Sequence, residues 1–565
     1  MANLSENNMY DAIVVGSGIS GGWAAKELCE KGLKTLILER GRDVPHPAGY
    51  TTTNMAPWEF DLRGSLAADE MKDYYIQGKC YAFNASTKHF FVNDREHPYE
   101  TPEDKPFNWI RGYHVGGRSL TWHRQCYRLS DLDFNANIKD GHGVDWPIRY
   151  KDIEPWYDYV EEFAGITGME EHLPQLPDSK FLPAMPLNCV EQHVRRAIKK
   201  NWDNRTLTKG RAAHLTVAHK GRGPCQYRNL CHSGCPFAGY FSSNSATLPA
   251  AYATGNLTLR PWSIAHSVIY DESLNKATGV RIVDAQTKDI LEFKAKLIFL
   301  CASTLGSTSI LLNSRSQRFP QGLGGNNDAL GHYLMDHAFE SGANGDMEGF
   351  GDKIDHGFIP NGIYIPRFRN VDEVHPDFLR GYGMQGNSWK NGWSRGLWSK
   401  GFGKEFKKAL TDADGWHFGM GGWGEHLPRH ENHIKLNYDR LDQWGMPILT
   451  ISCTHGDNEQ TMRKDMMVTA AEMLEAAGAK NIRTYMNPDA VPGHCIHEMG
   501  TARMGRDPKT SVLNRWNQVW DAPNVLVTDG ASMASSACQN PSLTYMALTA
   551  RAVDHAVAEL KKRNL

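Results

Sequence analysis

The sequence predicts an α/β domain with a largely parallel sheet, interwoven with an α+β domain built on a second β-sheet. Three observations lead to this fold class. Residues 10–39 alternate strand, glycine-rich turn, helix and strand, residues 256–302 again have strand character, and residues 340–455 are loop-and-strand material dense in Trp and Gly. A chain of 565 residues is also too long for one compact core, so two or three domains are expected.

The first observation is a complete βαβ unit. Residues 10–15 form an apolar run rich in β-branched side chains, which is typical of a buried strand. A helix is expected over residues 22–31, ended by Gly32 as its C-cap. Residues 33–38 are the second strand, which ends in Glu39. Units of this kind build Rossmann-like sheets.

The remaining elements are more scattered. Residues 45–110 are rich in Pro, Tyr, Asn and charge, and are expected to cross the surface as irregular chain. Amphipathic helices are predicted over residues 153–163 and 457–477. The strands expected in the middle of the chain span residues 256–260, 267–270, 279–283 and 297–300.

Composition argues against several classes of partner. The chain is 41% hydrophobic and 22% charged, with a formal net charge of -2, so neither nucleic acid nor an anionic membrane is expected as a partner. No segment approaches the roughly 20 apolar residues that cross a bilayer. Residues 1–8 are short and polar, so no signal peptide is expected. Eleven Cys, most of them scattered singly, do not form a disulfide framework and favour a reducing cytoplasm.

The turn after the first strand carries the strongest local motif. Gly16, Gly18 and Gly21 form G-x-G-x-x-G between a strand and a helix. The first glycine permits the tight turn, the second lets the backbone approach a pyrophosphate, and the third lets helix pack on strand. Glu39 is placed to accept from ribose hydroxyls. The alternative is an ordinary tight turn, and the motif alone does not choose between FAD and NAD.

Further motifs give a resemblance to a known family. They are His497-Glu-Met-Gly-Thr501, residues 504–505, 524–530 and 539–544, the loop 112–119, and residues 302–312 and 331–337. Together with the N-terminal unit they resemble the glucose–methanol–choline (GMC) oxidoreductase family over nearly the whole chain. The resemblance implies a Rossmann-like FAD-binding domain (1–45, 105–130, 205–340 and 485–565) interwoven with a β-sheet substrate domain and cap (46–104, 131–204 and 341–484).

The resemblance also implies an FAD site and its residues. The expected contacts are Gly16, Gly18, Ser20, Gly21, Glu39, Arg40, Gly116, Gly117, Ser119, Ala265, Asp529, Gly530, Asn540 and Ser542. The chain departs from the family at one point. Members of the family usually have Gly-Gly-Ser-Ser in the loop that corresponds to residues 112–119. This sequence has Arg118 there, and the sequence alone assigns no role to it.

His497 and Asn540 are the catalytic candidates, because the resemblance places a general base and a substrate-holding residue at these two positions. Alcohol oxidation needs a proton removed from oxygen while hydride leaves carbon, and an imidazole suits the first task. The alternatives are a structural histidine at 497 and a turn residue at 540 ahead of Pro541. His494 is expected to be a bystander.

Three cysteines are spaced differently from the rest. Cys225, Cys231 and Cys235 form C-x5-C-x3-C-P, and three thiolates suit a [3Fe-4S] cluster better than a [4Fe-4S] one. A zinc site completed by His232, or three free thiols, are the alternatives. Similar bacterial sugar and polyol dehydrogenases hold a [3Fe-4S] centre at this spacing, although Gln226 stands where some of them have a second cysteine.

A cluster would favour a dehydrogenase over an oxidase. The resemblance then implies a small hitch-hiker subunit and a cytochrome c as electron acceptor. It also implies export to the periplasm with a signal-bearing partner; otherwise the protein would stay in the cytoplasm.

The substrate prediction rests on a group of aromatic and polar residues between positions 381 and 445. Indoles stack on sugar rings and amides bond their hydroxyls, although each Trp alone is better explained as core. Overall the chain is most similar to catalytic subunits of FAD-dependent glucoside 3-dehydrogenases, which oxidise the C3 hydroxyl of glucose and glucosides. The alternatives are a pyranose oxidase, a polyol- or gluconate-type dehydrogenase, and a flavin-retaining lyase or structural subunit. The group comprises Trp389, Trp393, Trp398, Trp416, Trp423, Trp444, Gln385, Asn387, Glu425 and His426.

Overall fold

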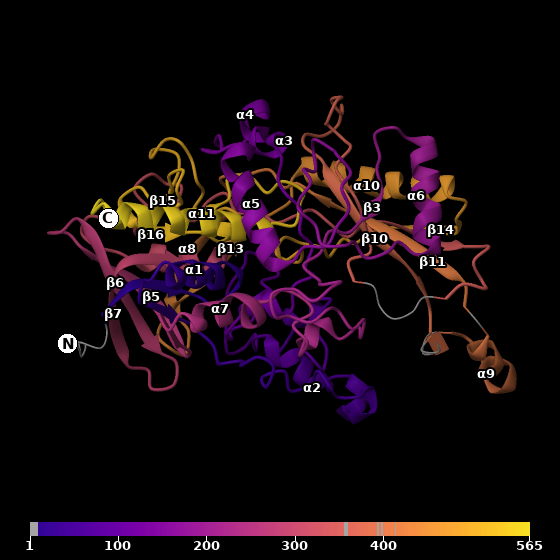
Figure 1. Ribbon diagram of the computed structural model, residues 1–565, viewed down its shortest axis with the longest axis horizontal. Helices are drawn as coiled ribbons and strands as arrows, with labels where there is room; N and C mark the ends of the chain where they lie inside the picture. The colour runs from indigo at the N-terminus through magenta and orange to yellow at the C-terminus, as the bar shows by residue number, and fades with distance from the viewer. Residues whose placement is uncertain (1–8, 355–359, 393–394, 397–398, 413) are drawn as a thin grey trace.

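The computed structural model describes residues 9–354, 360–392, 395–396, 399–412 and 414–565. Two large sheets lie toward opposite ends of the molecule's long axis, with helices packed on both (Figure 1). One sheet is mixed with a parallel centre and the other is antiparallel, which confirms the predicted combination of α/β and α+β folds.

The mixed sheet has the strand order β15-β16-β7-β1-β2-β4, and β6 joins it through β7 while pairing with β5. Strands β16, β7, β1, β2 and β4 run parallel. The strand bounds are β1 Met9–Val15, β2 Thr35–Leu38, β4 Leu257–Arg260, β5 Ser263–Asp271, β6 Lys276–Asp284, β7 Ile290–Leu300, β15 Gln518–Val519 and β16 Ala522–Val527.

Most of the predicted elements around this sheet are confirmed, with shifted ends. Helix α1 (Ile19–Glu30) begins three residues before the predicted start, because the glycine turn is shorter than expected and continues directly into the helix. The four strands predicted over residues 256–302 correspond to β4, β5, β6 and β7. Helices α11 (Ser542–Lys561) and α5 (Tyr150–Ala164) pack beside α1 along the sheet (Figure 1).

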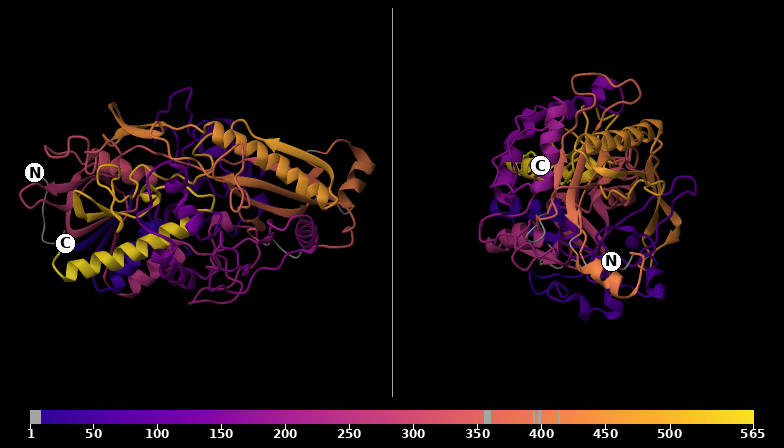
Figure 2. Two further views of the ribbon diagram at one scale, coloured as in Figure 1. Left: turned by 90° about the horizontal axis from the view of Figure 1, so that it is seen from above. Right: turned by 90° about the vertical axis from the view of Figure 1, so that its right-hand side faces the viewer.

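The antiparallel sheet has the order β14-β8-β11-β10-β9-β3. Helix α10 (Asp457–Ala476) lies along it in both views of Figure 2, and α6 (Cys189–Asn201) packs on the same core of apolar side chains. Helix α10 matches the prediction over residues 457–477. The strand bounds are β3 Thr208–Lys209, β8 Ser341–Met347, β9 Ile363–Ile365, β10 Tyr382–Lys390, β11 Trp416–Gly424 and β14 Lys480–Met486.

The rest of the described chain is short helices, one hairpin and loops. Residues 45–110 contain only short helical turns, as the irregular composition predicts. The hairpin pairs β12 (His433–Leu441) with β13 (Pro447–Ser452). The other helices are η2 Pro57–Glu59, η3 Asp61–Gly64, α2 Ala68–Met71, η4 Gln77–Lys79, η5 Lys88–Phe90, η6 Gly117–Leu120, α3 Asp131–Phe134, α4 Ala136–Asp140, η7 Cys231–Ser233, η8 Ser243–Thr247, α7 Leu248–Ala253, α8 Thr304–Asn313, α9 Gly403–Thr411 and η10 Gly530–Ser532.

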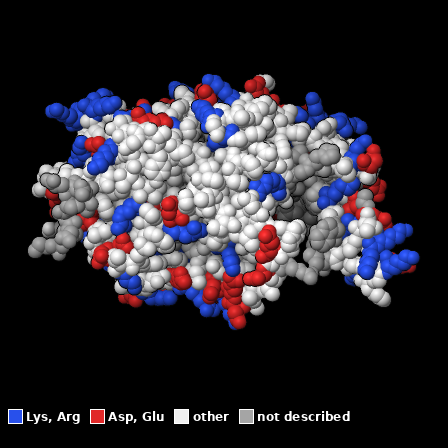
Figure 3. All heavy atoms as spheres, turned by 60° about the horizontal axis from the view of Figure 1, so that its bottom comes forward, with Lys and Arg blue, Asp and Glu red and all other residues white. Residues whose placement is uncertain are grey.

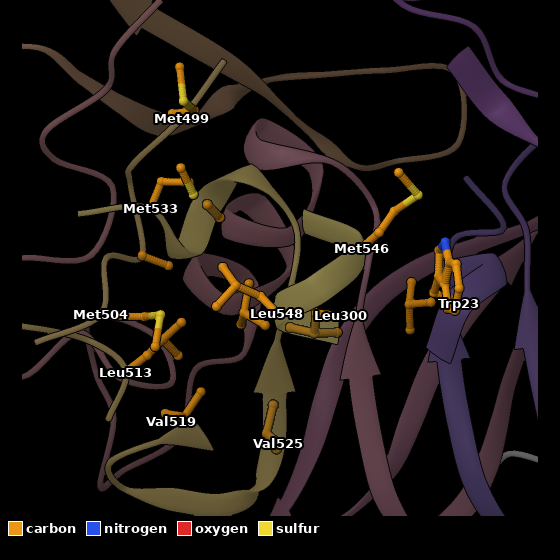
Figure 4. Close-up of a cluster of buried hydrophobic side chains, with 14 of the residues drawn as sticks. Trp23, Leu300, Met499, Met504, Leu513, Val519, Val525, Met533, Met546 and Leu548 are labelled. Carbon is orange, nitrogen blue, oxygen red and sulfur yellow. The ribbon is translucent and has the colours of Figure 1, made fainter. Parts of the chain in front are cut away.

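A buried core joins the mixed sheet to the loops of the C-terminal region. Trp23 from α1, Leu300 from β7 and Met546 from α11 are fully shielded from solvent, and Met499 and Met504 extend the same cluster (Figure 4). The segment that follows His497 is therefore packed into this core through Met499 and Met504.

The surface is mixed in charge. On the face shown in Figure 3, Lys and Arg side chains alternate with Asp and Glu, and uncharged atoms cover most of the middle. Among the described residues, no helix combines the length and apolar character needed to cross a lipid bilayer.

Candidate active site

A cavity of about 1710 Å³ extends from the carboxyl ends of the parallel strands to the antiparallel sheet. On the first side it is lined by residues that follow β1, β2 and β7, where open α/β sheets bind their ligands. On the other side β8, β10 and β11 supply the wall. Both sheets thus contribute to one site.

The glycine turn forms the floor of this cavity. Gly16 has φ +92°, and a Cβ there would lie 2.5 Å from the carbonyl oxygen of Cys301. A Cβ on Gly21 would lie 1.9 Å from the carbonyl oxygen of Gly16. At Gly18 a Cβ would meet only Gly116 O, at 4.0 Å, so the bare backbone there leaves room for a ligand at the start of α1. This cradle fits a dinucleotide pyrophosphate.

Glu39 holds the turn together. Its carboxylate accepts from the backbone N–H and hydroxyl of Ser17, at 3.0 and 2.5 Å, and from the N–H of Gly41 at 3.0 Å. Burial raises the pKa of Glu39, and these hydrogen bonds oppose the rise. Arg40 lies over the rings of Tyr113 and Trp444 at the same end of the cavity.

The loop around Gly116 packs against the glycine turn. Gly116 has φ +88°, and its N–H donates to Ser17 Oγ at 2.9 Å. Ser119 Oγ donates to Gly116 O at 2.6 Å and accepts from Ser243 N at 3.0 Å, so its hydroxyl stabilises the loop. A Cβ added at Gly117 would lie 3.6 Å from Gly18 Cα, so this loop and the glycine turn pack at van der Waals distance.

The structure gathers nearly all the predicted cofactor residues. Gly21 and Gly116 lie behind the cavity lining, while the other twelve line it: Gly16, Gly18, Ser20, Glu39, Arg40, Gly117, Ser119, Ala265, Asp529, Gly530, Asn540 and Ser542. Asp529 is fixed by Ser307 Oγ at 2.5 Å and Ala531 N at 3.0 Å, and burial raises its pKa to about 6. A buried donor, Arg40 Nε, has no hydrogen-bond partner among the described residues. The lining therefore fits FAD.

His497 and Asn540 meet in the cavity wall. Asn540 Nδ2 lies 3.3 Å from His497 Nε2, and Gln385 Nε2 donates to Asn540 Oδ1 at 2.8 Å. Burial, followed by the nearby charges of His337 and Arg118, lowers the pKa of His497 well below its ordinary value. His497 is therefore neutral, and a neutral imidazole has one nitrogen with a free lone pair that can accept a proton.

Asp336 holds the backbone that carries His497. Its two carboxylate oxygens accept from the N–H groups of Gly493, Cys495 and His497, at 2.7, 3.1 and 2.9 Å. Burial and then the charge of Glu498 raise the pKa of Asp336 to about 7. Asp336 lies in residues 331–337, which contribute to the family resemblance, but the sequence alone assigned no role to Asp336.

Arg118 acquires a partner that sequence reasoning missed. Its Nη1 and Nη2 donate to Glu498 Oε1 and Oε2, at 3.1 and 2.8 Å. The Glu498 side chain is 2% exposed and the Arg118 side chain 28%. This bidentate ion pair joins the loop 112–119 to Glu498, the residue after His497. His494, expected to be a bystander, lines the cavity, with Asn108 Nδ2 3.4 Å from its Nδ1.

The cysteine loop borders the same cavity through Tyr227 and Asn229. Cys225 Sγ accepts from Tyr227 N at 3.4 Å, Cys235 Sγ accepts from Gly239 N at 3.3 Å, and Cys231 Sγ lies 3.8 Å from His214 Nε2. The charges of the other two thiols contribute to raising the pKa of Cys225, after burial.

A single bound ion requires a more compact ligand set than these cysteines form. Among the described residues, ligand atoms within 4.8 Å of one another occur at His337–Cys495–His497 and at Asp328–His332–His430, and the cysteine trio is not such a group. The three cysteines are therefore not arranged as a preformed site for a single zinc ion.

Only some of the aromatic and polar residues predicted to bind substrate line the cavity. Trp389, Trp423, Gln385 and Asn387 line the cavity. Trp416 is a core residue at 1% exposure that only reaches the lining, and Trp444 stacks on His97 near Arg40. Trp393 and Trp398 lie outside the described residues.

The prediction is wrong for Glu425 and His426. Glu425 is fully buried and pairs with Arg380, and His426 Nδ1 lies 3.1 Å from Asp336 N. Both side chains are taken up by internal partners, so neither faces the cavity.

The parallel sheet and the glycine cradle define a dinucleotide-binding protein, in which a neutral histidine lies beside an amide in the cavity wall. Profiles of the GMC oxidoreductase family match residues 10–339 and 428–549. The chain belongs to this family; it is an FAD-dependent oxidoreductase that acts on alcohol groups.

Individual relatives are distant but match over nearly their whole length. The chain is 27% identical to 2-methyl-1,2-propanediol dehydrogenase of Mycolicibacterium austroafricanum, over 96% of this chain and 94% of that protein. It is 24% identical to the fructose dehydrogenase large subunit of Gluconobacter japonicus, over 99% of each. Among solved structures, a formate oxidase of Aspergillus oryzae superposes with a TM-score of 0.62 at 14% identity, covering 99% of this chain and 100% of that one, which bears on the fold alone.

Proposed function

We propose that the protein is a sugar dehydrogenase that oxidises a secondary hydroxyl of glucose or a glucoside, at ring carbon C3, to a ketone. The observation that carries the proposal is the pair of His497 Nε2 and Asn540 Nδ2, 3.3 Å apart in the wall of a cavity that reaches the antiparallel sheet. Bound FAD supplies the hydride acceptor for such a reaction.

The two side chains divide the work on the substrate hydroxyl. His497 Nε2 takes the hydroxyl proton, so that the carbon–oxygen double bond forms as the carbon gives up its hydrogen with the electron pair. Asn540 Nδ2 donates to the hydroxyl oxygen and stabilises its developing negative charge. Gln385 fixes the orientation of the Asn540 amide, because Gln385 Nε2 donates a hydrogen bond to Asn540 Oδ1.

The sheet side of the cavity is suited to a substrate with several hydroxyl groups. Amide and hydroxyl side chains lie there beside two indoles that can stack on a sugar ring. Asn361 is 3% exposed, and its Nδ2 has no hydrogen-bond partner among the described residues, which leaves a buried donor for a ligand. These lining residues are Asn344, Asn361, Gln385, Asn387, Ser388, Trp389 and Trp423.

The proposal includes an exit for electrons. A [3Fe-4S] cluster on Cys225, Cys231 and Cys235 would stand next to the cavity, because Tyr227 and Asn229 of the same loop line it. Backbone N–H groups already donate to two of the three sulfurs, as is common around thiolate ligands. Leu230 and Phe237 are 38% and 46% exposed beside them, an apolar surface suited to a protein partner.

The partners proposed are a small companion subunit and a cytochrome c. Support comes from the similarity to the fructose dehydrogenase large subunit, whose name implies further subunits. The compartment proposed is the periplasm, reached by export with a signal-bearing partner, with the cytoplasm as the alternative.

A second candidate is a polyol dehydrogenase, favoured by the similarity to 2-methyl-1,2-propanediol dehydrogenase. One anaerobic experiment separates the candidates: purified holoprotein is mixed with glucose, a methyl glucoside, gluconate or a 1,2-diol while flavin absorbance is followed. Bleaching by the glucose compounds supports the proposal, and bleaching only by diols or gluconate supports the other dehydrogenases. Iron assays test the cluster, and rapid peroxide release in air without iron would indicate a pyranose oxidase. No bleaching by any of them would leave a lyase or structural subunit.

A further inference from the structure

His337 forms a chain of contacts that ends at the proposed base. Its Nε2 lies 3.4 Å from the carbonyl oxygen of Ser536, and its Nδ1 lies 2.9 Å from His497 Nδ1. On the far side of the second ring, His497 Nε2 lies 3.3 Å from Asn540 Nδ2. His337 is fully buried and does not line the cavity, so it cannot touch the substrate.

The backbone sets the two rings opposite each other. Met335 and Met499 form an antiparallel bridge with both N–H···O bonds at 2.9 Å. In antiparallel pairing, residues two positions along each strand in opposite directions also face each other. This register places His337 opposite His497, and the rings meet edge to face at a centroid distance of 4.9 Å.

Only one distribution of protons satisfies every contact in this chain. Both rings are neutral, because burial lowers the pKa of His337 to about 4 and that of His497 well below its ordinary value. A neutral imidazole has one N–H donor and one acceptor nitrogen. The Ser536 carbonyl can only accept, so the proton of His337 sits on Nε2 and its Nδ1 is an acceptor. His497 must then donate from Nδ1, which leaves the lone pair on Nε2.

We propose that His337 is a positioning residue that fixes the tautomer of His497, so that the Nε2 lone pair faces the cavity and the substrate hydroxyl. This inference rests on the proposed role of His497 as the base. When His497 accepts a proton at Nε2, its Nδ1–H bond to His337 becomes charge-assisted and stronger. His337 would therefore also stabilise the protonated form during the reaction.

Cys495 is the competing partner at the same nitrogen. Its Sγ lies 3.2 Å from His497 Nδ1, and a thiol can donate weakly. If His337 offered no acceptor, the Cys495 thiol could donate to Nδ1 and the proton of His497 would move to Nε2. That tautomer presents a donor to the substrate and cannot take its proton. His337 thus selects the active tautomer over a nearby alternative.

Two variants test the inference. His337→Asn keeps an acceptor, because its Oδ1 can take the place of Nδ1, whereas His337→Leu removes the acceptor at similar volume. Both proteins are prepared with FAD and with ¹⁵N-labelled histidine, and the His497 ring signals are assigned from their loss in His497→Ala. Ring ¹⁵N shifts separate a protonated from an unprotonated nitrogen and so report the tautomer directly.

In the wild type we expect the proton on His497 Nδ1, retained in His337→Asn and lost in His337→Leu. The limiting rate of flavin reduction should fall roughly 100-fold in His337→Leu, the usual scale for a misplaced general base, with substrate affinity nearly unchanged. His337→Asn should stay within about tenfold of the wild type. An Nε2–H tautomer in the wild type, or an unchanged tautomer and rate in His337→Leu, would overturn the inference. If the tautomers behave as expected but His497→Ala reduces its flavin normally, the tautomer assignment stands and His497 is not the base.

Discussion

Replacement of Arg118 by Met tests the ion pair that joins the loop 112–119 to the segment that carries His497. Arg118 and Glu498 form two parallel hydrogen bonds, at 3.1 and 2.8 Å, and the carboxylate side chain is 2% exposed. Arg118→Met would leave that carboxylate buried without its cation. Removing one partner of a buried pair costs about 3–5 kcal/mol. Because the arginine side chain is 28% exposed, we expect the lower part of this range, about 3 kcal/mol of the free energy of unfolding.

The double variant Arg118→Met/Glu498→Met removes both charges at similar volume. Replacing both partners of a buried pair by apolar side chains is often neutral, so most of the lost stability should return. Arg281 and Glu292 provide a matched control, since their side chains are 42% and 15% exposed and Arg281→Met should cost less than about 1 kcal/mol.

The assay is urea unfolding of FAD-loaded protein at a fixed excess of FAD, followed by circular dichroism. We expect the Arg118→Met midpoint to fall well below that of Arg281→Met, and the double variant to lie between Arg118→Met and wild type. An Arg118→Met protein no less stable than Arg281→Met, or a double variant as unstable as the single one, would show that the ion pair does not stabilise the fold in this way.

Three other predictions follow from the same site. Gly21→Ala would place a Cβ 1.9 Å from Gly16 O, so the turn must shift, and purified protein should contain much less FAD by flavin fluorescence; full occupancy would contradict the cradle. Because the lowered pKa of His497 keeps it unprotonated, the rate of flavin reduction should be flat above about pH 6.5 and decline only in acid, and a rate still rising above pH 7 would exclude this base. Cys231→Ser should spare flavin reduction but slow electron transfer to an external protein acceptor, and unchanged transfer would remove the cysteine loop from the path.

The sequence predicted those helices and strands whose formation is determined by residues close together in the chain. The βαβ unit and α10 could be predicted because apolar periodicity and glycine punctuation are properties of short segments. The start of α1 was misplaced because glycine disfavours helix interiors in general, whereas Gly21 is required here by its contact with Gly16 O.

In the candidate site, too, residues in local motifs could be predicted, whereas contacts between residues distant in the sequence could not. Motifs led to His497 and Asn540, which the structure brings to 3.3 Å. The partner of Arg118 lies 380 residues away, and His337 lies 160 residues from His497, so no local spacing could connect them. Glu425 failed as a substrate residue because its pairing with Arg380 depends on tertiary burial, which composition does not reveal.

The central claim is that His497 removes a proton from an alcohol substrate beside bound FAD. The most direct measurement compares anaerobic flavin reduction in wild type and His497→Ala, at equal FAD content, with glucose and a methyl glucoside. We predict rapid bleaching in the wild type and a limiting rate lower by at least roughly 100-fold in His497→Ala, the usual contribution of a positioned general base. Equal rates in the two proteins would contradict the claim.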